Sequence, residues 1–470
     1  MSFLPVFLWT DILIFLLVAV IAVAAFYIRT QPHLSTPWKS VIKRKRGMIS
    51  VMILGVYIIV GLLDSLHYRP ALDATKNAKE VYYSSEVFSV FDWLVLPLKQ
   101  QLEKTYSAPF ADRLFVKEIQ TMDDGSINYD YPKLKYGAAH LASSDHKTSD
   151  IYQTILKASL LSLLLLFLIY VCHTAIASRA HVSQIFPQTK RIFLNHSDYP
   201  LHTFYFTAFC LLLLICNLAL LSQNYHVFGT DKVGQDVLYQ SLKSIRTGLV
   251  IGTLTTLVML PMAIMLGIAA GYFRGWIDDL IQYIYTTLNS IPGVLLIAAA
   301  VLILQVYMNN HPENFKTIAE RADIRLLFLC IILGMTSWTG LCRILRAETL
   351  KLREAEYVMA SRALGAGSFS ILRKHILPNL MHLVLIAVVL DFSGLVLAEA
   401  VLSYVGVGVD PSMISWGNMI NSARLEMARE PVVWWSLTAA FISMFVLVLA
   451  ANLFADVVRD AFDPRMQGTL

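Results

Sequence analysis

The chain has 470 residues, of which 56% are hydrophobic and only 15% are charged, and its mean hydropathy is +0.59. These values exclude an ordinary soluble protein and indicate a protein that crosses a membrane several times. The formal net charge is +5, but the basic residues cluster beside apolar stretches. We therefore attribute them to membrane topology, with anionic lipid as the alternative for residues 43–46, and we expect no nucleic-acid partner.

Nine apolar stretches are each about long enough, at roughly 20 residues, to cross the hydrocarbon layer of a membrane. They lie near residues 4–28, 48–66, 151–177, 203–222, 246–271, 281–307, 326–342, 380–403 and 432–455. We therefore expect an all-α integral membrane protein, built as a polytopic helical bundle. Basic residues at 43–46, 179–191, 343–374 and Arg459 share one side if the N-terminus is outside and the C-terminus inside. The positive-inside rule makes that side the cytoplasm.

Composition divides the chain into four segments. Residues 1–66 contain the N-terminal spans, and the polar, proline-containing residues 67–150 are predicted to form an extracytoplasmic insertion, part folded and part loop. Residues 151–202 hold an additional span and a cytoplasmic loop, and residues 203–470 form the transmembrane core. The five cysteines lack metal-ligand spacing and are interpreted as packing residues, while His226 and two other histidines have no carboxylate or cysteine at motif spacing.

Two pairs of glycines lie in the fifth apolar stretch, each pair four residues apart. They are Gly248 with Gly252 and Gly267 with Gly271. Small residues at this spacing let transmembrane helices approach closely. We expect these faces to pack within the bundle, or against a second subunit.

A polar island at residues 347–378 separates two apolar stretches. Its first half, residues 354–365, predicts an amphipathic helix, and Gly365 and Gly367 can supply the positive φ that ends it. A second short helix is expected to run into Pro378. A helix, a glycine turn and a helix on the cytoplasmic face form a surface knob that can dock into a groove of another protein.

Two carboxylates, Asp391 and Glu399, lie inside the eighth apolar stretch, eight residues apart and so on roughly one helical face. A charge at this depth costs about 2.5 to 3.5 kcal/mol, so each should face a polar interior or a cationic partner. For Glu399 a structural role and a position lining a polar pathway both remain open. The glycines, proline and Trp416 of residues 404–418 predict a re-entrant or interfacial segment.

Several blocks of the second half resemble one transporter family. They are Gly229-Thr-Asp231 with Gly234-Gln-Asp236, residues 271–278, residues 398–408, Ser415-Trp-Gly-Asn418 and residues 459–465. In this order they resemble the inner-membrane permease subunits of binding-protein-dependent ABC importers, in particular the peptide and nickel subgroup. Gly365, Leu377 and Pro378 match the loop signature of that family, whereas Met359, Ala360 and Ser361 replace its Glu-Ala-Ala triplet.

The resemblance implies a type I importer permease in the bacterial inner membrane that pairs with a second permease subunit, two ATPase subunits and an extracytoplasmic substrate-binding protein. The residues implied for coupling to the ATPases are Glu356, Tyr357, Met359, Ala360, Ser361, Arg362, Ala363, Gly365, Leu377 and Pro378. Those implied for the surface toward the binding protein are Gly229, Thr230, Asp231, Gly234, Asp236, Ser415, Trp416 and Gly417. Asp391 and Glu399 are candidates for the translocation path.

No enzyme motif is present in the sequence. A phosphate-binding Gly-x-x-x-x-Gly-Lys-Ser/Thr loop is absent, so ATP and magnesium are expected on the partner ATPases, with no cofactor, metal or catalytic residue in this chain. The alternative function is an ion-coupled secondary transporter that uses Asp391 or Glu399, and a third is a nonconducting scaffold. Within the importer interpretation, peptides, nickel, opines and peptide-like antibiotics all remain possible substrates.

Overall fold

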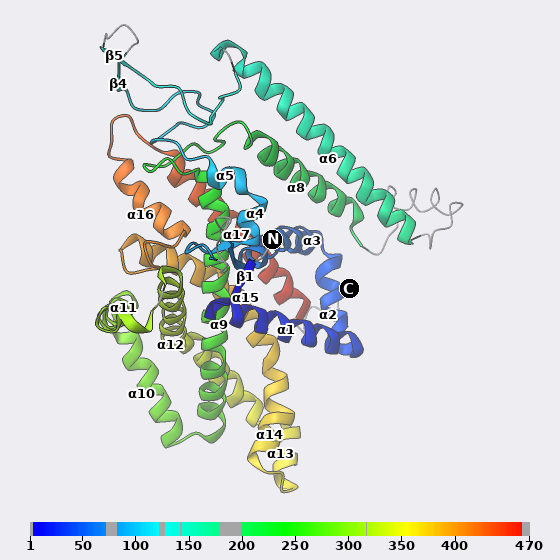
Figure 1. The fold of residues 1–470 in the computed structure, drawn as a ribbon. Helices are drawn as coiled ribbons and strands as arrows, with labels where there is room; N and C mark the ends of the chain where they lie inside the picture. The colour runs from blue at the N-terminus through cyan, green and yellow to red at the C-terminus, as the bar shows by residue number, and fades with distance from the viewer. Residues whose placement is uncertain are drawn as a thin grey trace.

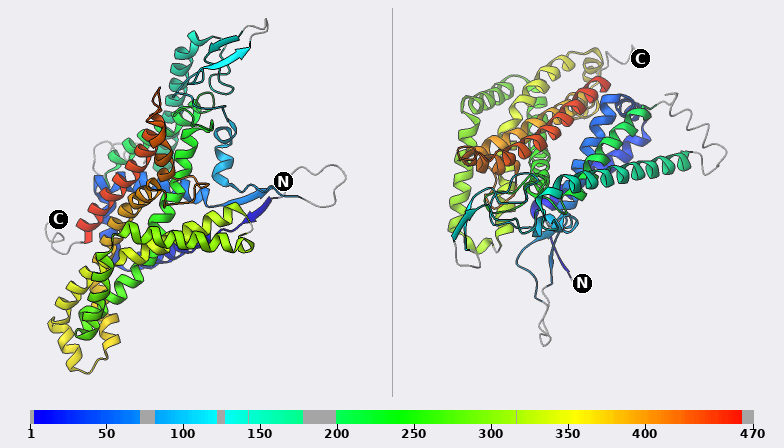
Figure 2. Two further views of the ribbon diagram at one scale, coloured as in Figure 1. Left: turned by 90° about the vertical axis from the view of Figure 1, so that its left-hand side faces the viewer. Right: turned by 90° about the horizontal axis from the view of Figure 1, so that it is seen from above.

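The computed structural model describes residues 3–71, 82–121, 127–141, 143–177, 199–315 and 317–462. The predicted basic cluster at 179–191 lies outside these residues. Within the described ranges, nine helices are long and apolar enough to cross a membrane, which confirms a polytopic helical bundle. Figure 1 shows that α13 and α14 lie at the end of the molecule opposite to β4 and β5, and the left view of Figure 2 agrees.

The N-terminal half combines spans with the short elements of the predicted insertion. Its elements are β1 (Phe3–Val6), α1 (Trp9–Thr30), α2 (Pro32–Lys43), α3 (Lys45–Asp64), β2 (His67–Pro70), β3 (Phe88–Ser89), α4 (Val90–Leu94), α5 (Leu96–Gln100), β4 (Glu118–Thr121), β5 (Ile127–Asp130), a 3₁₀ turn (Ser144–His146), α6 (Lys147–Ala177) and α8 (Leu201–Leu221). Strands β1, β2 and β3 form one antiparallel sheet, and β4 pairs with β5 in a hairpin.

The described residues of the second half form helices joined by short non-helical segments, with no strand among the elements. Its elements are α9 (Val237–Phe273), α10 (Trp276–Ser290), α11 (Gly293–Asn310), a 3₁₀ turn (Pro312–Asn314), α12 (Ile318–Arg353), α13 (Glu356–Ala363), α14 (Ser368–Ile371), a π-helical turn (Leu372–Ile376), α15 (Leu377–Tyr404), α16 (Trp416–Glu426) and α17 (Trp435–Phe462). The single span predicted at 281–307 is wrong, because the chain breaks between α10 and α11. Ile291 precedes Pro292 and is extended, a conformation that proline imposes on its neighbour.

Helices α9 and α12 form the centre of the bundle, and glycines let them approach. A Cβ on Gly267 would lie 2.8 Å from the carbonyl oxygen of Cys342, and one on Gly271 would lie 2.7 Å from that of Arg346. Gly252 is equally close to Phe392 of α15. The prediction that these faces pack within the bundle is therefore confirmed.

Two predicted cytoplasmic segments meet on the side of the bundle formed by α2, α3 and α17. Arg44, at the break between α2 and α3, forms an ion pair with Asp460 at 2.7 Å. The rings of Trp38 and Phe462 pack edge to face beside this pair. The structure thus places the basic N-terminal cluster next to the end of the last span, as the topology requires.

The insertion covers the outer end of the core. Tyr106 is buried in the same apolar cluster as Val237 of α9 and Trp435 of α17. A second cluster joins Leu98 and Ala138 of the insertion to Tyr225. Part of residues 67–150 is therefore packed on the transmembrane core, which agrees with the expectation that part of the insertion is folded.

Candidate functional site

The predicted cytoplasmic loop forms a compact knob beyond the end of α12. The α13 helix ends at Ala363, and Gly365 follows with a φ of +82° and donates its N–H to the carbonyl of Arg362. The Ala366 N–H reaches back to Ser361 at 3.1 Å. A positive φ suits glycine because it has no Cβ. The prediction for Gly365 is confirmed, but that for Gly367 is wrong, because its φ is −66° and it opens α14 in an extended conformation.

The knob has one buried face and one exposed face. Val358 and Ile371 are buried in the core cluster shared by α9, α10, α12 and α15. On the opposite face, Leu364 is 89% exposed and Phe369 is 78% exposed. Large apolar side chains that project from a polar surface are typical of a site where another protein binds.

The predicted second helix of the knob does not end at Pro378. It continues through the π-helical turn Leu372–Ile376 into α15, so that Leu377 and Pro378 begin the eighth span. A proline cannot donate the backbone hydrogen bond of a regular helix, and a widened turn just before it accommodates this loss. Ile376 in this turn is fully buried, which anchors the knob to the bundle.

Ion pairs fix the base of the knob. Arg346 of α12 donates two hydrogen bonds to the carboxylate of Asp278 of α10, at 2.6 and 2.7 Å. These bonds hold the pKa of Asp278 below its usual value. Arg274 also pairs with Glu354 at 2.8 Å, just before α13 begins. A paired, bidentate arginine gives this end of α10 and α12 a defined geometry.

The remaining predicted residues of the knob lie on or beside α13. Glu356, Met359, Arg362 and Ala363 are exposed, and Ala360 is exposed beside them. Tyr357 is also exposed, and its hydroxyl accepts a hydrogen bond from Asn379 at 3.1 Å. The structure therefore gathers the predicted coupling residues into one cytoplasmic projection, while their contact with an ATPase stays a prediction.

The predicted outer segment 229–236 lies beneath the insertion. Thr230 and Ser107 exchange hydrogen bonds, Thr230 N–H to Ser107 O at 3.1 Å and Ser107 N–H to the Thr230 hydroxyl at 2.7 Å. The Glu103 N–H donates to Gly234 O at 3.0 Å. Gly229, Thr230, Gly234 and Asp236 are buried within the chain itself, and Asp231 alone of this set is partly exposed. The four buried residues do not form an outer surface, because residues 103–107 cover them.

A buried histidine clamps the insertion to the start of α9. The His226 imidazole lies 2.7 Å from the carboxylate of Asp236 through Nδ1 and 3.4 Å from that of Glu103 through Nε2. Burial alone would lower the pKa of His226, but hydrogen bonds and charge from the two carboxylates raise it to about 9. Sequence spacing missed this site, because Glu103 is 123 residues away. The presence of Asp236 ten residues after the histidine was the one local signal.

Glu103 accepts several hydrogen bonds in this contact between the insertion and the core. Its carboxylate accepts hydrogen bonds from the consecutive N–H groups of Lys135, Tyr136 and Gly137 at 2.7 to 3.1 Å. Burial alone would raise the pKa of Glu103, but the bonds from His226 and these three amides lower it to about 2. Four donors around one carboxylate therefore join two loops of the insertion to the core.

The second outer set packs against the eighth span. Ser415 caps α16, and Trp416 is 1% exposed and donates its indole N–H to Ser241 O at 3.1 Å. Ser415, Trp416 and Gly417 are all buried within the chain, so these three predicted residues do not form an exposed outer surface, and Trp416 packs on Gly248 of α9. A Cβ on Gly417 would lie 2.8 Å from the Glu399 carboxylate, so the structure brings these two predicted sites together.

The two intramembrane carboxylates have different surroundings. Glu399 is buried, and it accepts a hydrogen bond from the Ser403 hydroxyl at 2.8 Å. With Gly417 beside it, this contact favours the structural role for Glu399. Asp391 is half-buried, and its carboxylate has neither a hydrogen bond nor an ion pair within the described parts of the chain. Its assignment to the translocation path stays a prediction.

Comparison with known proteins supports the family resemblance. The family described as the binding-protein-dependent transport system inner membrane component matches residues 263–468. A glutathione transport system permease protein of Pectobacterium atrosepticum is 32% identical over 244 residues, which cover 52% of this chain and 73% of the relative. The chain belongs to this family. It is therefore a multi-pass protein of an inner-membrane transport system.

Two further relatives have similar coverage. A dipeptide transport system permease protein of Bacillus subtilis is 32% identical over 52% of this chain and 69% of its own length. An oligopeptide transport system permease protein of Mycobacterium bovis is 30% identical over 51% of this chain and 76% of its own length. The matched family region contains the cytoplasmic knob, Asp391 and Glu399, while the insertion and the first spans lie before it.

Proposed function

We propose that this chain is the permease subunit of an ATP-driven importer of short peptides. Relatives that match about half of this chain are permeases named for dipeptides, oligopeptides and glutathione, itself a small peptide. The mechanism is supported by the cytoplasmic knob, in which Leu364 and Phe369 are exposed on one face and Val358 and Ile371 are buried on the other. Such a knob offers an apolar docking surface and is also rigidly attached to the bundle.

In this mechanism the chain forms half of the translocation path and moves to open it. Partner subunits hydrolyse ATP and capture the peptide. The knob seats on one of two ATPase subunits, which would carry ATP and magnesium, and closure of the two ATPases moves the knob as a lever. Because α12 and α15 continue directly into the knob, the motion tilts both helices and alternately opens the path. A second permease subunit forms the other half of the path, and an extracytoplasmic binding protein delivers the peptide. The chain itself is non-catalytic.

A matched pair of glycine substitutions tests this proposal. Gly365→Val places a β-branched residue at φ +82°, which costs roughly 1 to 2 kcal/mol and distorts the end of α13. Gly367→Val places the same residue at φ −66°, where it is unstrained. Neither added Cβ meets a neighbouring atom within 4 Å, so the two variants differ in backbone strain and not in packing.

We expect Gly365→Val to reduce peptide uptake several-fold while ATP hydrolysis by the assembled complex continues, and Gly367→Val to behave as the wild type. Uptake and hydrolysis are measured on the same complexes, together with recovery of the ATPase subunits. Equal uptake by both variants would contradict the lever. Uptake that needs no ATPase subunit and follows an ion gradient would instead support the secondary transporter that uses Asp391 or Glu399.

A further inference from the structure

A basic corner lies where α2 meets α3, on the predicted cytoplasmic side of the bundle. We use this name for Lys39 and Lys43 of α2 together with Lys45 and Arg46, the first two residues of α3. All four residues are exposed. Figure 1 shows α2 apart from α13 and α14, so the basic corner is separate from the cytoplasmic knob.

The positive charge of the basic corner is not matched by acidic residues of the chain. From Ile12 to Leu63 the sequence contains six lysines and arginines and no aspartate or glutamate. Arg44 pairs with Asp460 of α17, but none of the four residues of the corner forms an ion pair within the described parts of the chain. Like charges this close together repel one another, so an anion beside them would be stabilising.

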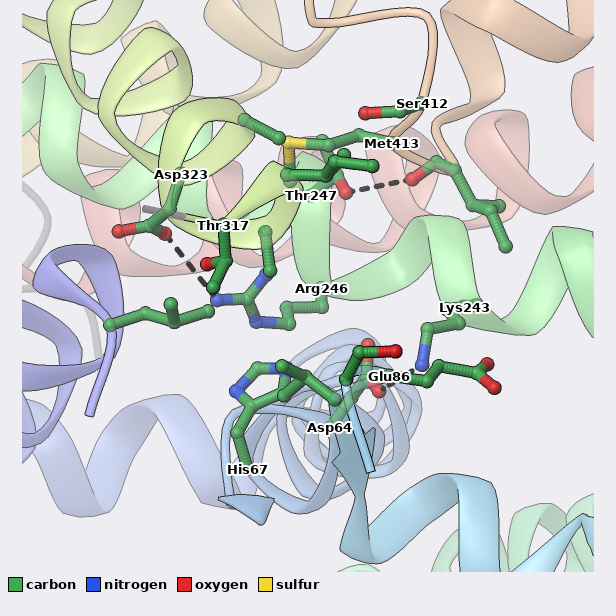
Figure 3. Close-up of a pocket in the computed structure, with 17 residues that line it drawn as sticks. Asp64, His67, Glu86, Lys243, Arg246, Thr247, Thr317, Asp323, Ser412 and Met413 are labelled. Carbon is green, nitrogen blue, oxygen red and sulfur yellow. Dashed lines mark hydrogen bonds and ion pairs between the residues drawn. The ribbon is translucent and has the colours of Figure 1, made fainter. Parts of the chain in front are cut away.

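Charged side chains on the predicted outer side of the bundle are paired within the chain instead. Figure 3 shows a cavity of about 640 Å³ that contains Arg246 and Lys243. Arg246 donates to Asp11 at 2.5 Å, and Lys243 bridges Asp64 at 3.1 Å and Asp92 at 2.6 Å. The fold thus provides counter-charges for its outer cations, whereas the counter-charge of the basic corner has to come from outside the described chain.

The opposite face of α2 is apolar and already covered. Val41 is 1% exposed and lies in an apolar cluster with Val457 of α17. This contact holds α2 with its basic face outward, because Lys39 and Lys43 are four residues apart and share one side of the helix. Ile42 is next to Lys43 and is 40% exposed. The open face of α2 therefore combines two cations with an apolar side chain.

The basic corner also lies at the ends of three predicted spans. Helix α2 joins two of them, because α1 ends at Thr30 and α3 begins at Lys45. The Lys43 Nζ lies 5.9 Å from the centre of the Tyr199 ring, and the third span, α8, begins two residues later. Tyrosine and lysine at the ends of spans are typical of the layer of lipid headgroups. A phospholipid beside these spans brings its phosphate to the level of the corner.

We propose that the basic corner binds the anionic headgroup of a phospholipid, such as phosphatidylglycerol, in the cytoplasmic leaflet. Clusters of roughly four to eight lysines and arginines directly beside a span, or on an amphipathic helix, bind anionic lipids. The lysine stems and Ile42 contact the apolar part of the lipid, and the charged ends reach its phosphate. Because α2 and α3 precede the matched family region, the N-terminal part of this chain adds the site to the core.

Native mass spectrometry of the purified full chain in detergent measures which lipid stays bound. We expect phosphatidylglycerol to bind about tenfold more tightly than phosphatidylcholine, whose headgroup has no net charge. The combined change Lys43→Gln, Lys45→Gln and Arg46→Gln should abolish this preference. The combined change Lys43→Arg, Lys45→Arg and Arg46→Lys keeps the charges and should retain it. Lys45→Gln alone should reduce the preference about fivefold, which tests the site even if the triple glutamine variant does not fold.

A matched control removes three exposed cations from the predicted extracytoplasmic insertion. Changing Lys117, Lys133 and Lys135 to glutamine alters the net charge by the same amount and should leave the lipid preference unchanged. Thermal unfolding in the same detergent shows whether each variant is folded.

Four results would overturn the proposal. The wild type could bind both lipids equally, or the control could lose the preference as completely as the triple glutamine variant. Glycerol 3-phosphate could displace the lipid at an equal concentration, and the corner would then be a site for a soluble phosphate. In the assembled transporter, the triple glutamine variant could retain as much phosphatidylglycerol as the wild type, and a partner subunit would then cover the corner.

Discussion

The attachment of the insertion to the core makes a sharp prediction at Glu103. Glu103→Gln keeps the volume of the side chain but removes the charge that faces His226 and three backbone N–H groups. The pKa of Glu103 is lowered to about 2 from its ordinary 4.5, and its side chain is only 3% exposed. At 1.36 kcal/mol for each pH unit, the carboxylate contributes about 3 kcal/mol. We expect local opening of this interface to become about a hundredfold more frequent.

Hydrogen exchange measures this opening at amides that do not contact Glu103. The N–H groups of Thr230 and Ser107 bond across the interface to each other's residue, so their protection reports whether the insertion is seated. Glu118→Gln is the matched control, because it makes the same chemical change in an ion pair with Lys104 at the surface of the insertion. Surface pairs contribute at most about 1 kcal/mol.

The clamp should also depend on pH. The raised pKa of His226 gives stability that is complete below about 6.5 and is lost as the pH rises through about 9. The lowered pKa of Glu103 gives stability that is complete above about 4.5 and is lost as the pH falls toward 2. The interface is therefore strongest between about pH 4.5 and 6.5. In Glu103→Gln the pKa of His226 falls, so protection should decline at a lower pH than in the wild type.

Protection of Thr230 and Ser107 that changes less than threefold in Glu103→Gln would refute this account of the clamp. So would an equal loss of protection in Glu118→Gln, because the effect would then come from the surface and not from the buried carboxylate. A pH profile that is flat between 6.5 and 9 would contradict the charged state assigned to His226.

Three further predictions address the bundle, the path and the topology. Gly252→Leu forces a side chain into the ring of Phe392 and should destabilise the protein by about 1 to 3 kcal/mol. Gly394→Leu is the control, because a Cβ there meets no atom within 4 Å, and it should not destabilise the protein. Thermal unfolding in detergent compares the two variants. If the Asp391 carboxylate contacts substrate, Asp391→Asn should reduce peptide uptake and leave recovery of the complex normal. If the carboxylate pairs with a partner subunit, the same change should lower recovery of the complex. Normal uptake together with normal recovery would exclude both roles. A cysteine at Ser412 should react with an impermeant maleimide from outside and one at Ser368 should not, and the reverse pattern would overturn the topology.

The sequence by itself determined the properties that depend on neighbouring residues. Apolar stretches of about 20 residues predicted the spans of the described residues except at 281–307, where the chain breaks between α10 and α11, because backbone groups in lipid must be satisfied within a helix. The polar island at 347–378 and the positive φ at Gly365 were also local signals. Family motifs then predicted the membership that the comparisons confirm.

The tertiary structure decided where separate segments meet. Hydropathy gave no reason for Ser107 to cover Thr230, or for Glu103 to reach His226 across 123 positions, because such contacts depend on the path of the insertion over the core. The same holds for Trp416, which is polar enough for an interface but is buried on Gly248. The cavity around Arg246 follows this rule too, because its walls come from six separate parts of the chain that meet only when the fold closes around them.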